Sequence, residues 1–298
     1  MRVVRRARAL LALLVATVLA AVAGCGAGAD PADPPRLVLG VIPYENSQSV
    51  TDDWKPFVAM LEKASGKPVE LKVLTDYAAL IEGQRAGVIQ LAVYGSLSYV
   101  LAHDTGAGVE PLGVEIMRKG AKPEYRSYLV TKAGSPIRSL GDLRGKRVCF
   151  VDPNSTSGYL YPVAALLAEG IGSGDYTARY AGGHDATVLG VRDGDCDAGA
   201  VQDRLFDEAL PSEGRIAQKD FQKIWTSGPI VNGPLAVSTK LNPGLRKTLA
   251  DAVISEGNAD ALGVPDVAGV WGFAPVSDSL YDSVREACAA TKVKVCGG

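Results

Sequence analysis

Short apolar runs alternate with stretches of helical spacing along this chain. The first run, Leu37–Ile42, is followed by helical spacing from about Thr51 to Ser65, a second run at Val69–Leu74, a helical stretch at Tyr77–Arg85 and a third run at Leu91–Tyr94. Short apolar runs predict buried strands, and apolar residues at three- and four-residue steps predict amphipathic helices. This order, with short turns, is typical of a parallel sheet covered by helices.

The same order returns in the second half of the chain, beginning at Lys146. It predicts strands and helices at Val148–Val151, Ser157–Glu169, Thr177–Tyr180, Ala186–Arg192 and Asp197–Val201. We therefore expect an α/β protein with two lobes of similar build, each a mostly parallel sheet covered by helices.

Two further segments are expected to cross between the lobes. Tyr125–Thr131 alternates like a strand, and Leu235–Ser238 does so after a proline-bounded turn. The second crossing returns the chain to the first lobe, which the helix Pro243–Glu256 and the tail complete. We expect residues 36–131 plus 232–298 to form lobe I and residues 132–231 to form lobe II.

The first residues predict export from the cytoplasm. Four arginines precede an apolar run from Ala9 to Ala23, which is shorter than the ~20 residues of a membrane span and is typical of a secretory signal peptide over residues 1–24. The junction Val22-Ala23-Gly24-Cys25 resembles a bacterial lipobox, which predicts that Cys25 is lipidated; a chance cluster of small residues beside a cysteine is the alternative. Residues 25–35 have the composition of a flexible tether.

The charge balance disfavours nucleic acid as a partner. Removal of the signal peptide takes four of the 31 basic residues and none of the 33 acidic ones, so the mature chain carries a net charge of about −6. With 47% hydrophobic residues, the chain can build a large core.

Four cysteines remain in the mature chain if Cys25 is lipidated, and an even number in an oxidising compartment favours disulfides. Cys149 and Cys196 each open a predicted strand and could meet at one end of a parallel pair, whereas Cys288 and Cys296 are close along the tail. We expect these two pairings, with buried free thiols as the alternative. The spacing does not indicate a zinc site.

Three consecutive hydroxyl residues, Ser155, Thr156 and Ser157, occupy the turn between a predicted strand and a predicted helix. One serine there is explained as an N-cap of the helix, but three exceed what capping requires. Free backbone N–H groups and the positive end of the helix dipole favour an anion at this position. We therefore expect an oxyanion-binding turn.

Ligands of parallel α/β sheets bind at the carboxyl ends of the strands. Two such edges that face one another form a cleft, and several polar or aromatic residues follow predicted strands at these edges. Besides the hydroxyl turn they are Tyr44, Tyr77, Tyr94, His184 and Asp203. Packing in the core is the alternative for the tyrosines, and capping is the alternative for His184.

Several motifs, in order and spacing, resemble the periplasmic phosphonate-binding protein family over about Leu37 to Ala289. They are Gly40-Val41-Ile42-Pro43, Tyr94-Gly95-Ser96-Leu97-Ser98-Tyr99, Asp152-Pro153-Asn154-Ser155-Thr156-Ser157-Gly158-Tyr159, Gly183-His184-Asp185 and Asp197-Ala198-Gly199-Ala200-Val201-Gln202-Asp203. The family comprises substrate-binding components of ATP-driven importers for phosphate, phosphite and phosphonates.

The resemblance implies a type II periplasmic-binding-protein fold that closes on its ligand, with an ABC permease and its ATPase as partners, and we expect a monomer. It also implies ligand roles for Ser155, Thr156, Ser157, Tyr94, His184, Asp203 and Tyr44. Asp203 would accept a hydrogen bond from a P–OH group or from a ligand ammonium group. The chain departs from the family pattern at Gly95-Ser96, where Gly-Pro is more common, and at Gln202, where Asn is usual. A sensory protein that presents its closed form to a membrane receptor kinase is the alternative function.

An enzymatic function is disfavoured by the sequence. A hydrolytic triad from Ser155 or Ser157, His184 and Asp203 would need the histidine between the other two, and the turn lacks the Gly-x-Ser-x-Gly pattern of a nucleophile elbow. No cluster of metal-ligating residues is apparent, so we expect neither a metal nor a cofactor.

Overall fold

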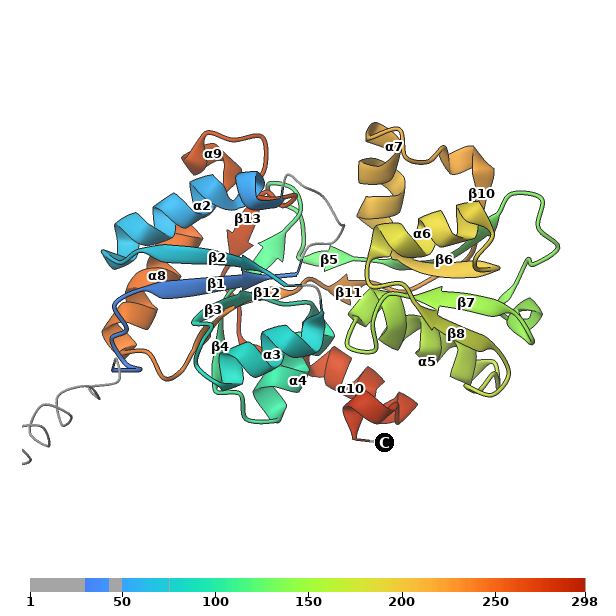
Figure 1. Cartoon of the computed structure of the whole chain (residues 1–298), viewed down its shortest axis with the longest axis horizontal. Helices are drawn as coiled ribbons and strands as arrows, with labels where there is room; N and C mark the ends of the chain where they lie inside the picture. Colours follow the sequence, from blue (N-terminus) through green and yellow to red (C-terminus); the bar gives the residue numbers. More distant parts are fainter. Residues whose placement is uncertain (1–29, 43–49, 75, 298) are drawn as a thin grey trace, which may run out of the picture.

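A computed structural model describes residues 30–42, 50–74 and 76–297. These residues form two lobes, each built on one β-sheet, joined by a short two-stranded connection (Figure 1). The expected signal peptide, the lipidation site Cys25, the first part of the tether and Tyr44 lie outside the described residues.

The sheet of lobe I has six strands in the order β13-β4-β12-β3-β1-β2. Strands β1, β2 and β3 are parallel, whereas β12 runs antiparallel to both β3 and β4, and β13 runs antiparallel to β4. The strands are β1 (Leu37–Val41), β2 (Val69–Val73), β3 (Leu91–Val93), β4 (Val109–Ile116), β12 (Pro234–Ser238) and β13 (Gly272–Ala274).

The sheet of lobe II has five strands in the order β10-β6-β9-β7-β8. Strand β7 is parallel to β8 and β9, and β6 is antiparallel to β9 and β10. The strands are β6 (Ser127–Lys132), β7 (Arg147–Phe150), β8 (Thr177–Tyr180), β9 (Ala198–Gln202) and β10 (Phe221–Thr226). Both sheets are therefore mixed. In lobe II the antiparallel strand is β6, which enters from lobe I. In lobe I the antiparallel strands are β12, which enters from lobe II, and β13, which follows α9 within the same lobe.

The connection between the lobes is shorter than the sequence suggested. Strand β5 (Glu124–Tyr125) pairs antiparallel with β11 (Ile230–Val231), and this pair forms a sheet of its own between the lobes. Ser127–Val130 pairs with Gly199–Gln202 and so belongs to the sheet of lobe II, while Pro234–Ser238 lies within the sheet of lobe I. The two segments expected to cross are thus sheet strands, and the crossing itself is β5 and β11.

Helices cover both faces of each sheet, so each lobe has a hydrophobic core on either side of its sheet. Local sequence sets their ends: Asp76 accepts a hydrogen bond from the N–H of Ala79 at the start of α3, and Gly194, with a positive φ of 87°, ends α6. In lobe I lie α2 (Val50–Ser65), α3 (Tyr77–Arg85), α4 (Ser96–Asp104), α8 (Pro243–Ser255), α9 (Ala259–Leu262) and η5 (Asp278–Tyr281). In lobe II lie η1 (Leu140–Leu143), η2 (Thr156–Leu160), α5 (Tyr161–Ala168), α6 (His184–Asp193), η3 (Leu205–Ala209), α7 (Leu210–Ser212) and η4 (Gln218–Asp220).

The C-terminal helix α10 (Asp282–Thr291) lies under the connection and contacts both lobes (Figure 1). It packs against α4 of lobe I and against η2 and α5 of lobe II. Val284 and Cys288 of α10 share one buried cluster with Leu160 of η2. After α10, the short turn η6 (Lys294–Cys296) ends the described chain.

Two disulfides join the cysteine pairs that the sequence suggested. Cys149 on β7 is bonded to Cys196, which precedes β9, with a Cα–Cα distance of 5.8 Å. Cys288 of α10 is bonded to Cys296, with a Cα–Cα distance of 5.5 Å. The first disulfide fastens two neighbouring parts of the lobe II sheet, and the second closes the tail onto α10.

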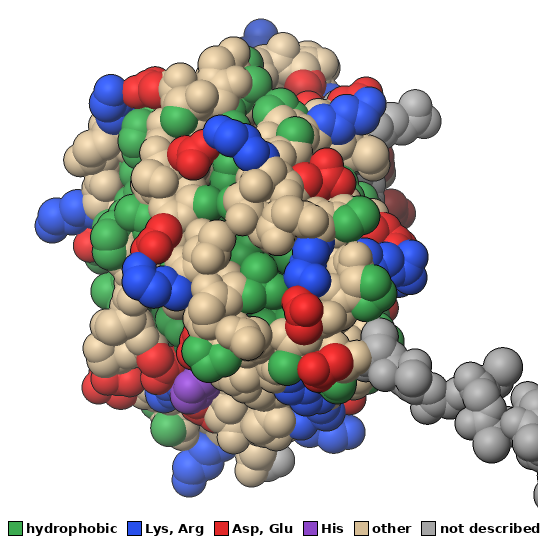
Figure 2. All heavy atoms as spheres, turned by 90° about the vertical axis from the view of Figure 1, so that its left-hand side faces the viewer, with side chains coloured by type: hydrophobic (Ala, Val, Ile, Leu, Met, Phe, Trp, Pro, Cys, Tyr) green, Lys and Arg blue, Asp and Glu red, His purple; other side chains and the backbone are tan. Residues whose placement is uncertain are grey.

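The end face of lobe I shows basic and acidic side chains interspersed, without a patch of one sign (Figure 2). This view provides no basic stripe of the kind that binds nucleic acid. Among the helices of the described residues, none combines the length and the apolar character that crossing a membrane requires.

Candidate functional site

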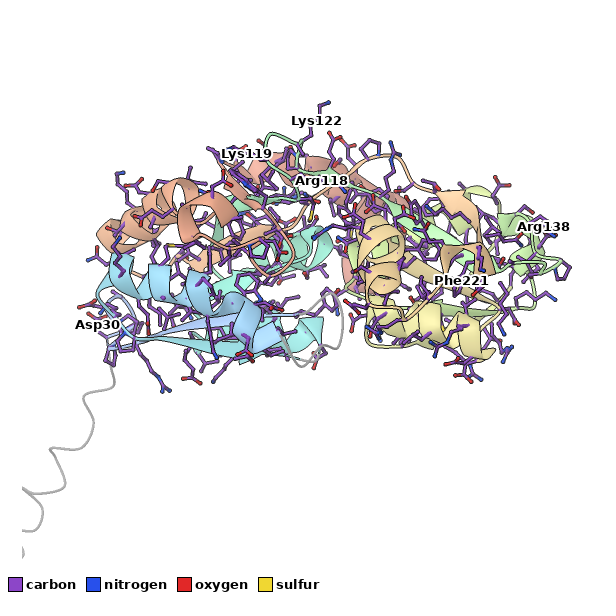
Figure 3. All side chains as sticks on the ribbon, turned by 90° about the horizontal axis from the view of Figure 1, so that it is seen from above. Asp30, Arg118, Lys119, Lys122, Arg138 and Phe221 are labelled. Carbon is purple, nitrogen blue, oxygen red and sulfur yellow. A yellow bond between two sulfur atoms is a disulfide. The ribbon has the colours of Figure 1, made fainter. Side chains whose placement is uncertain are left out.

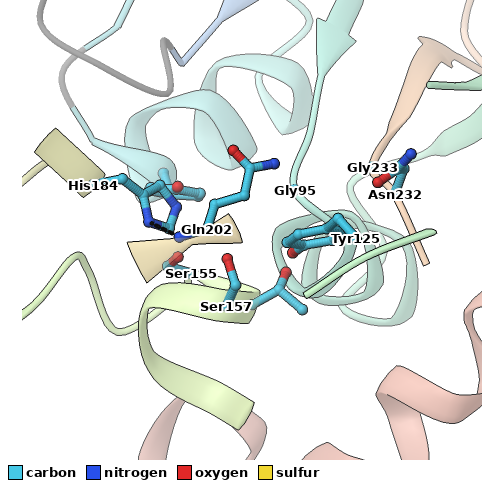
Figure 4. A pocket seen from close by; sticks show the side chains of 10 residues that line it. Gly95, Tyr125, Ser155, Ser157, His184, Gln202, Asn232 and Gly233 are labelled. Carbon is cyan, nitrogen blue, oxygen red and sulfur yellow. Dashed lines mark hydrogen bonds between the residues drawn. The ribbon is translucent and has the colours of Figure 1, made fainter. Parts of the chain in front are cut away.

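A small enclosed hollow lies where the two lobes meet, and both lobes and the connection contribute to its wall. Its volume is about 20 Å³, which is room for about one water molecule. The residues that line it are Tyr77, Gly95, Tyr125, Ser155, Thr156, Ser157, His184, Gln202, Asn232 and Gly233 (Figure 4).

The hydroxyl turn forms the lobe II side of this pocket. Ser155 is the N-cap of the helical turn that follows, and its Oγ accepts a hydrogen bond from the N–H of Gly158 over 3.1 Å. Thr156 and Ser157 are both 2% exposed and belong to η2, a π-helical turn of the kind often found at functional sites. A side chain at Gly158 would be 2.4 Å from Val151, so glycine lets this turn pack closely on the end of the strand.

Thr156 reaches across the cleft to lobe I. Its Oγ1 accepts a hydrogen bond from the backbone N–H of Leu97 over 2.8 Å. Helix α4 begins after Gly95, which has no side chain to cap it. The hydroxyl of the opposite lobe therefore satisfies one of the free N–H groups at the start of α4.

His184, the first residue of α6, faces the pocket as a neutral imidazole. The backbone N–H of Gln202 donates to Nδ1 of His184 over 3.2 Å (Figure 4). Burial lowers the pKa of His184 to about 4, so the ring carries one proton near neutral pH. Because Nδ1 accepts, that proton is on Nε2, which leaves Nε2–H as a hydrogen-bond donor.

Two tyrosines add phenol groups to the wall. Tyr77 lines the pocket together with Ser155, and burial raises the pKa of Tyr77 to about 12. Tyr125, on β5, lines the pocket together with Thr156 and Ser157, and burial raises the pKa of its phenol as well. Both phenols therefore remain protonated and can donate to an anion.

Among the described residues that line the pocket, none is an arginine or a lysine. Its polar groups are hydroxyls, an imidazole, two side-chain amides and backbone groups. Across the described residues, no group of three or more His, Cys, Asp or Glu is arranged to hold a metal ion. Such a wall can bind an oxyanion through directed neutral hydrogen bonds, aided by the helix starts at η2 and α6.

The structure brings together Ser155, Thr156, Ser157 and His184, but it places Tyr94 elsewhere. The side chain of Tyr94 is 1% exposed within the core of lobe I, and its hydroxyl donates to Oε1 of Gln84 over 2.7 Å. The buried amide of Gln84 provides the phenol with a partner inside the lobe. The structure therefore places the Tyr94 phenol outside the pocket wall, and its expected contact with the ligand stays a prediction.

Asp203 is also outside the pocket. Its Oδ2 accepts from the backbone N–H of Arg126 over 2.9 Å and its Oδ1 accepts from the backbone N–H of Arg204 over 2.8 Å. Both carboxylate oxygens thus accept backbone N–H groups, one at the start of β6 and one in the turn after β9. Burial raises the pKa of this carboxyl group. The expected role of Asp203 as an acceptor for the ligand is not supported by this geometry.

Asp203 lies instead beside a second, more open hollow that shares Tyr125 with the pocket. Charged residues of both lobes line this hollow, among them Arg118 of lobe I and Glu208 of lobe II, which form an ion pair across the cleft. Arg118 lies between the two lobes in the view from above (Figure 3). Both side chains are largely exposed, so this pair contributes little to holding the lobes together.

Sequence reasoning missed Tyr125, Gln202, Asn232 and Gly233 as pocket residues, whereas Tyr77 was among the strand-end candidates that it named. Tyr125 and Asn232 belong to or follow the crossing strands β5 and β11. The predicted crossing segments could have identified them, because residues that connect two lobes lie beside the cleft between the lobes. Gln202 is one position before Asp203. The sequence analysis chose the correct strand end but named the next residue along the chain.

The fold and the enclosed pocket define the class of two-lobed substrate-binding proteins. The profile of the family described as ABC transporter, phosphonate, periplasmic substrate-binding protein matches residues 39–281. The chain belongs to this family. It is therefore the substrate-binding component of an ABC transporter, and members of such a family work outside the cytoplasm.

Individual relatives agree with this assignment. The phosphate-import protein PhnD of Mycolicibacterium smegmatis is 36% identical over 285 residues, covering 89% of this chain and 88% of the relative. Among solved structures, a binding protein component of an ABC phosphonate transporter from Pseudomonas aeruginosa is 25% identical with a TM-score of 0.78, covering 88% and 89% of the two chains. PhnD1 of Prochlorococcus marinus in complex with methylphosphonate, 22% identical with a TM-score of 0.76, covers 87% of this chain and 98% of its own, and shows the same fold.

Proposed function

We propose that this protein captures a small tetrahedral phosphorus oxyanion, namely phosphate, phosphite or a phosphonate, between its lobes and delivers it to an ABC permease for import. The single observation that carries the proposal is the convergence of Ser155, Thr156, Ser157 and the Nε2–H of His184 on one hollow between the lobes. The names of the relatives, which refer to phosphate import and to methylphosphonate, support the same class of ligand.

The ligand would be held by hydrogen bonds from hydroxyls, from the imidazole and from the two phenols, Tyr77 and Tyr125. Hydrogen bonds to a charged group contribute about 1.5–3 kcal/mol each. Micromolar binding requires about 8 kcal/mol, so five or six such donors suffice without a lysine or an arginine. Because the hollow of about 20 Å³ holds about one water molecule, the lobes must part to admit a tetrahedral anion.

Calorimetry tests this proposal against phosphate, phosphite, methylphosphonate, aminoethylphosphonate and sulfate. We expect micromolar or tighter binding of at least one phosphorus oxyanion. Ser157→Ala should weaken it about ten-fold or more by removing a pocket hydroxyl, whereas the matched control Ser212→Ala, on α7 away from the pocket, should not. No heat with any of the five anions would contradict the proposal.

The ligand would be bound without chemical change. His184 receives a backbone N–H at Nδ1, where a triad histidine would donate to a carboxylate, and Asp203 is committed to the backbone N–H groups of Arg126 and Arg204. Incubation with a chromogenic phosphate ester should therefore give no turnover above buffer. Turnover that Ser157→Ala abolishes would overturn this part.

The mature protein would be a monomer held at the membrane by a lipid on Cys25, through a tether that ends near Arg36. The lipobox-like junction and the signal-like first 24 residues support this. Cys25→Ala should move the protein from the membrane fraction to the soluble extracytoplasmic fraction. Retention of the variant in the membrane fraction would contradict lipid anchoring at Cys25.

A further inference from the structure

Asn232 lines the pocket, and only the nitrogen of its side-chain amide has a hydrogen-bond partner among the described residues. It follows β11, is 1% exposed, and its backbone N–H donates to the carbonyl of Pro123 over 2.8 Å. Its Nδ2 donates to the carbonyl of Glu115 on β4 over 2.8 Å. Its Oδ1 is buried and has no hydrogen-bond partner among the described residues.

The orientation of this amide is fixed by its neighbours. The Glu115 carbonyl can only accept, so the NH₂ group of Asn232 must face it and the oxygen must face the other way. In the close view, the Asn232 oxygen is on the side of the other lining side chains and its nitrogen points away from them (Figure 4). An acceptor therefore faces the hollow.

The backbone also prevents this acceptor from moving away. A side chain at Gly233 would have its Cβ 1.7 Å from the carbonyl oxygen of Tyr94, so the two segments are in contact at a point that only glycine allows. The carbonyl of Gly233 additionally accepts from the N–H of Glu115 over 3.1 Å. Asn232 thus presents its oxygen from a fixed backbone.

A buried acceptor without a donor costs about 1–3 kcal/mol. Among the described residues, no hydroxyl of the pocket wall makes a hydrogen bond to this oxygen. A ligand between the lobes can supply this missing hydrogen, but a fully ionised oxyanion has no hydrogen to donate. An oxyanion that keeps one proton on oxygen does.

We propose that Asn232 is a specificity-determining residue that selects an oxyanion carrying a P–OH group, by accepting its hydrogen bond. This rests on the proposed function, since it concerns the same pocket. Phosphate retains at least one P–OH group throughout the neutral range. Methylphosphonate and phosphite keep one only below their second ionisation, and sulfate has none.

The first test uses the wild-type protein and compares methylphosphonate with phosphate by calorimetry, from neutral pH to well above the second ionisation of methylphosphonate. Above the second ionisation of methylphosphonate, its Kd relative to that of phosphate should rise about ten-fold per pH unit, because its protonated form is depleted. The elements around Asn232 carry Glu115, Glu124, Tyr125, Tyr77 and His184, and taking the ratio at each pH removes the effect of their own titration. A ratio that stays within about two-fold would overturn the inference.

The second test is Asn232→Ala with Asn154→Ala as the matched control, because the Asn154 side chain bonds Asp152 outside the pocket wall. Removing the free acceptor should narrow the preference for phosphate over sulfate by about ten-fold, and the control should retain the wild-type preference. An unchanged preference in a folded Asn232→Ala would refute the role of Asn232 while phosphate binding still stands. A wild-type protein that binds none of these anions would refute the proposed function itself.

Discussion

The hydroxyl of Thr156 in lobe II accepts a hydrogen bond from the backbone N–H of Leu97 in lobe I, over 2.8 Å. One side chain thereby belongs to the pocket wall and also completes the start of a helix on the opposite lobe. Closing the cleft therefore also brings the Leu97 N–H to its hydrogen-bond acceptor, the Oγ1 of Thr156. An anion that entered the pocket would find this N–H at the start of α4 beside it.

Thr156→Val should make the closed form less stable. Valine has nearly the same shape but no oxygen, so closing the cleft would bury the Leu97 N–H without a partner, at a cost of about 1–3 kcal/mol. In the absence of ligand, small-angle X-ray scattering should show a larger radius of gyration for Thr156→Val than for wild type. Thr156→Ser keeps the hydroxyl and should behave as wild type; equal radii for all three would argue against the contact as a closing interaction.

His184 should make the protein less stable in acid. Its pKa is about 4 when folded and about 6.5 when unfolded, so between these values the unfolded chain binds a proton that the folded chain does not. The free energy of unfolding is unaffected by this titration above about pH 6.5. It falls as the pH is lowered toward 4, by about 3 kcal/mol in total. Urea unfolding of His184→Gln across this range should lack this loss. His103→Gln, which changes the other histidine, should retain it.

Asp203→Asn should lower stability rather than change ligand preference. The carboxylate accepts one backbone N–H at each oxygen, and a carboxamide can accept only one of the two. We expect a loss of about 1–3 kcal/mol in urea unfolding and an unchanged ratio of phosphate to methylphosphonate affinity. If the variant kept its stability but lost protonated ligands selectively, Asp203 would belong to the pocket after all.

The two disulfides should differ in their contribution to stability. Their partners are separated by 47 and 8 residues, so loop-closure entropy assigns about 4 kcal/mol to Cys149–Cys196 and about 2.5 kcal/mol to Cys288–Cys296. Double Ala variants of each pair, unfolded in urea, measure the two losses. Wild-type protein, denatured without reductant, should show no free thiol from these four cysteines; four free thiols would rule out both bonds.

The sequence predicted much of the fold because the pattern of apolar residues is local. The runs at Leu37–Ile42 and Val148–Val151 are strands to within a residue at their ends, and the two-lobe arrangement follows from the repeated order. The direction of the returning strands was not predictable in this way, because β12 pairs with β3 and β4 from more than a hundred residues earlier. Pairing over such distances leaves no local signal.

The site was predictable where a motif and a strand end coincide, as at Ser155 and His184. It was not predictable where a side chain could turn to either face. Tyr94 stands at a strand end, but the buried amide of Gln84 offers its hydroxyl a partner on the inner side. Asn232 was missed for the opposite reason: a lone asparagine in a turn is normally explained by the turn, and only its unpaired oxygen in three dimensions distinguishes it.

Helix α10 has a consequence for how the molecule opens. Because it packs on α4 and on α5, the two halves share a common floor on one side, beneath β5 and β11. Parting them beside α10 would expose the cluster around Leu160 and Cys288 to water, whereas the hollow beside Asp203 is bridged by exposed charges such as Arg118 and Glu208. Opening should therefore be a rotation of the lobes about α10 and the β5–β11 pair. Solutes should then enter beside the ion pair of Arg118 and Glu208.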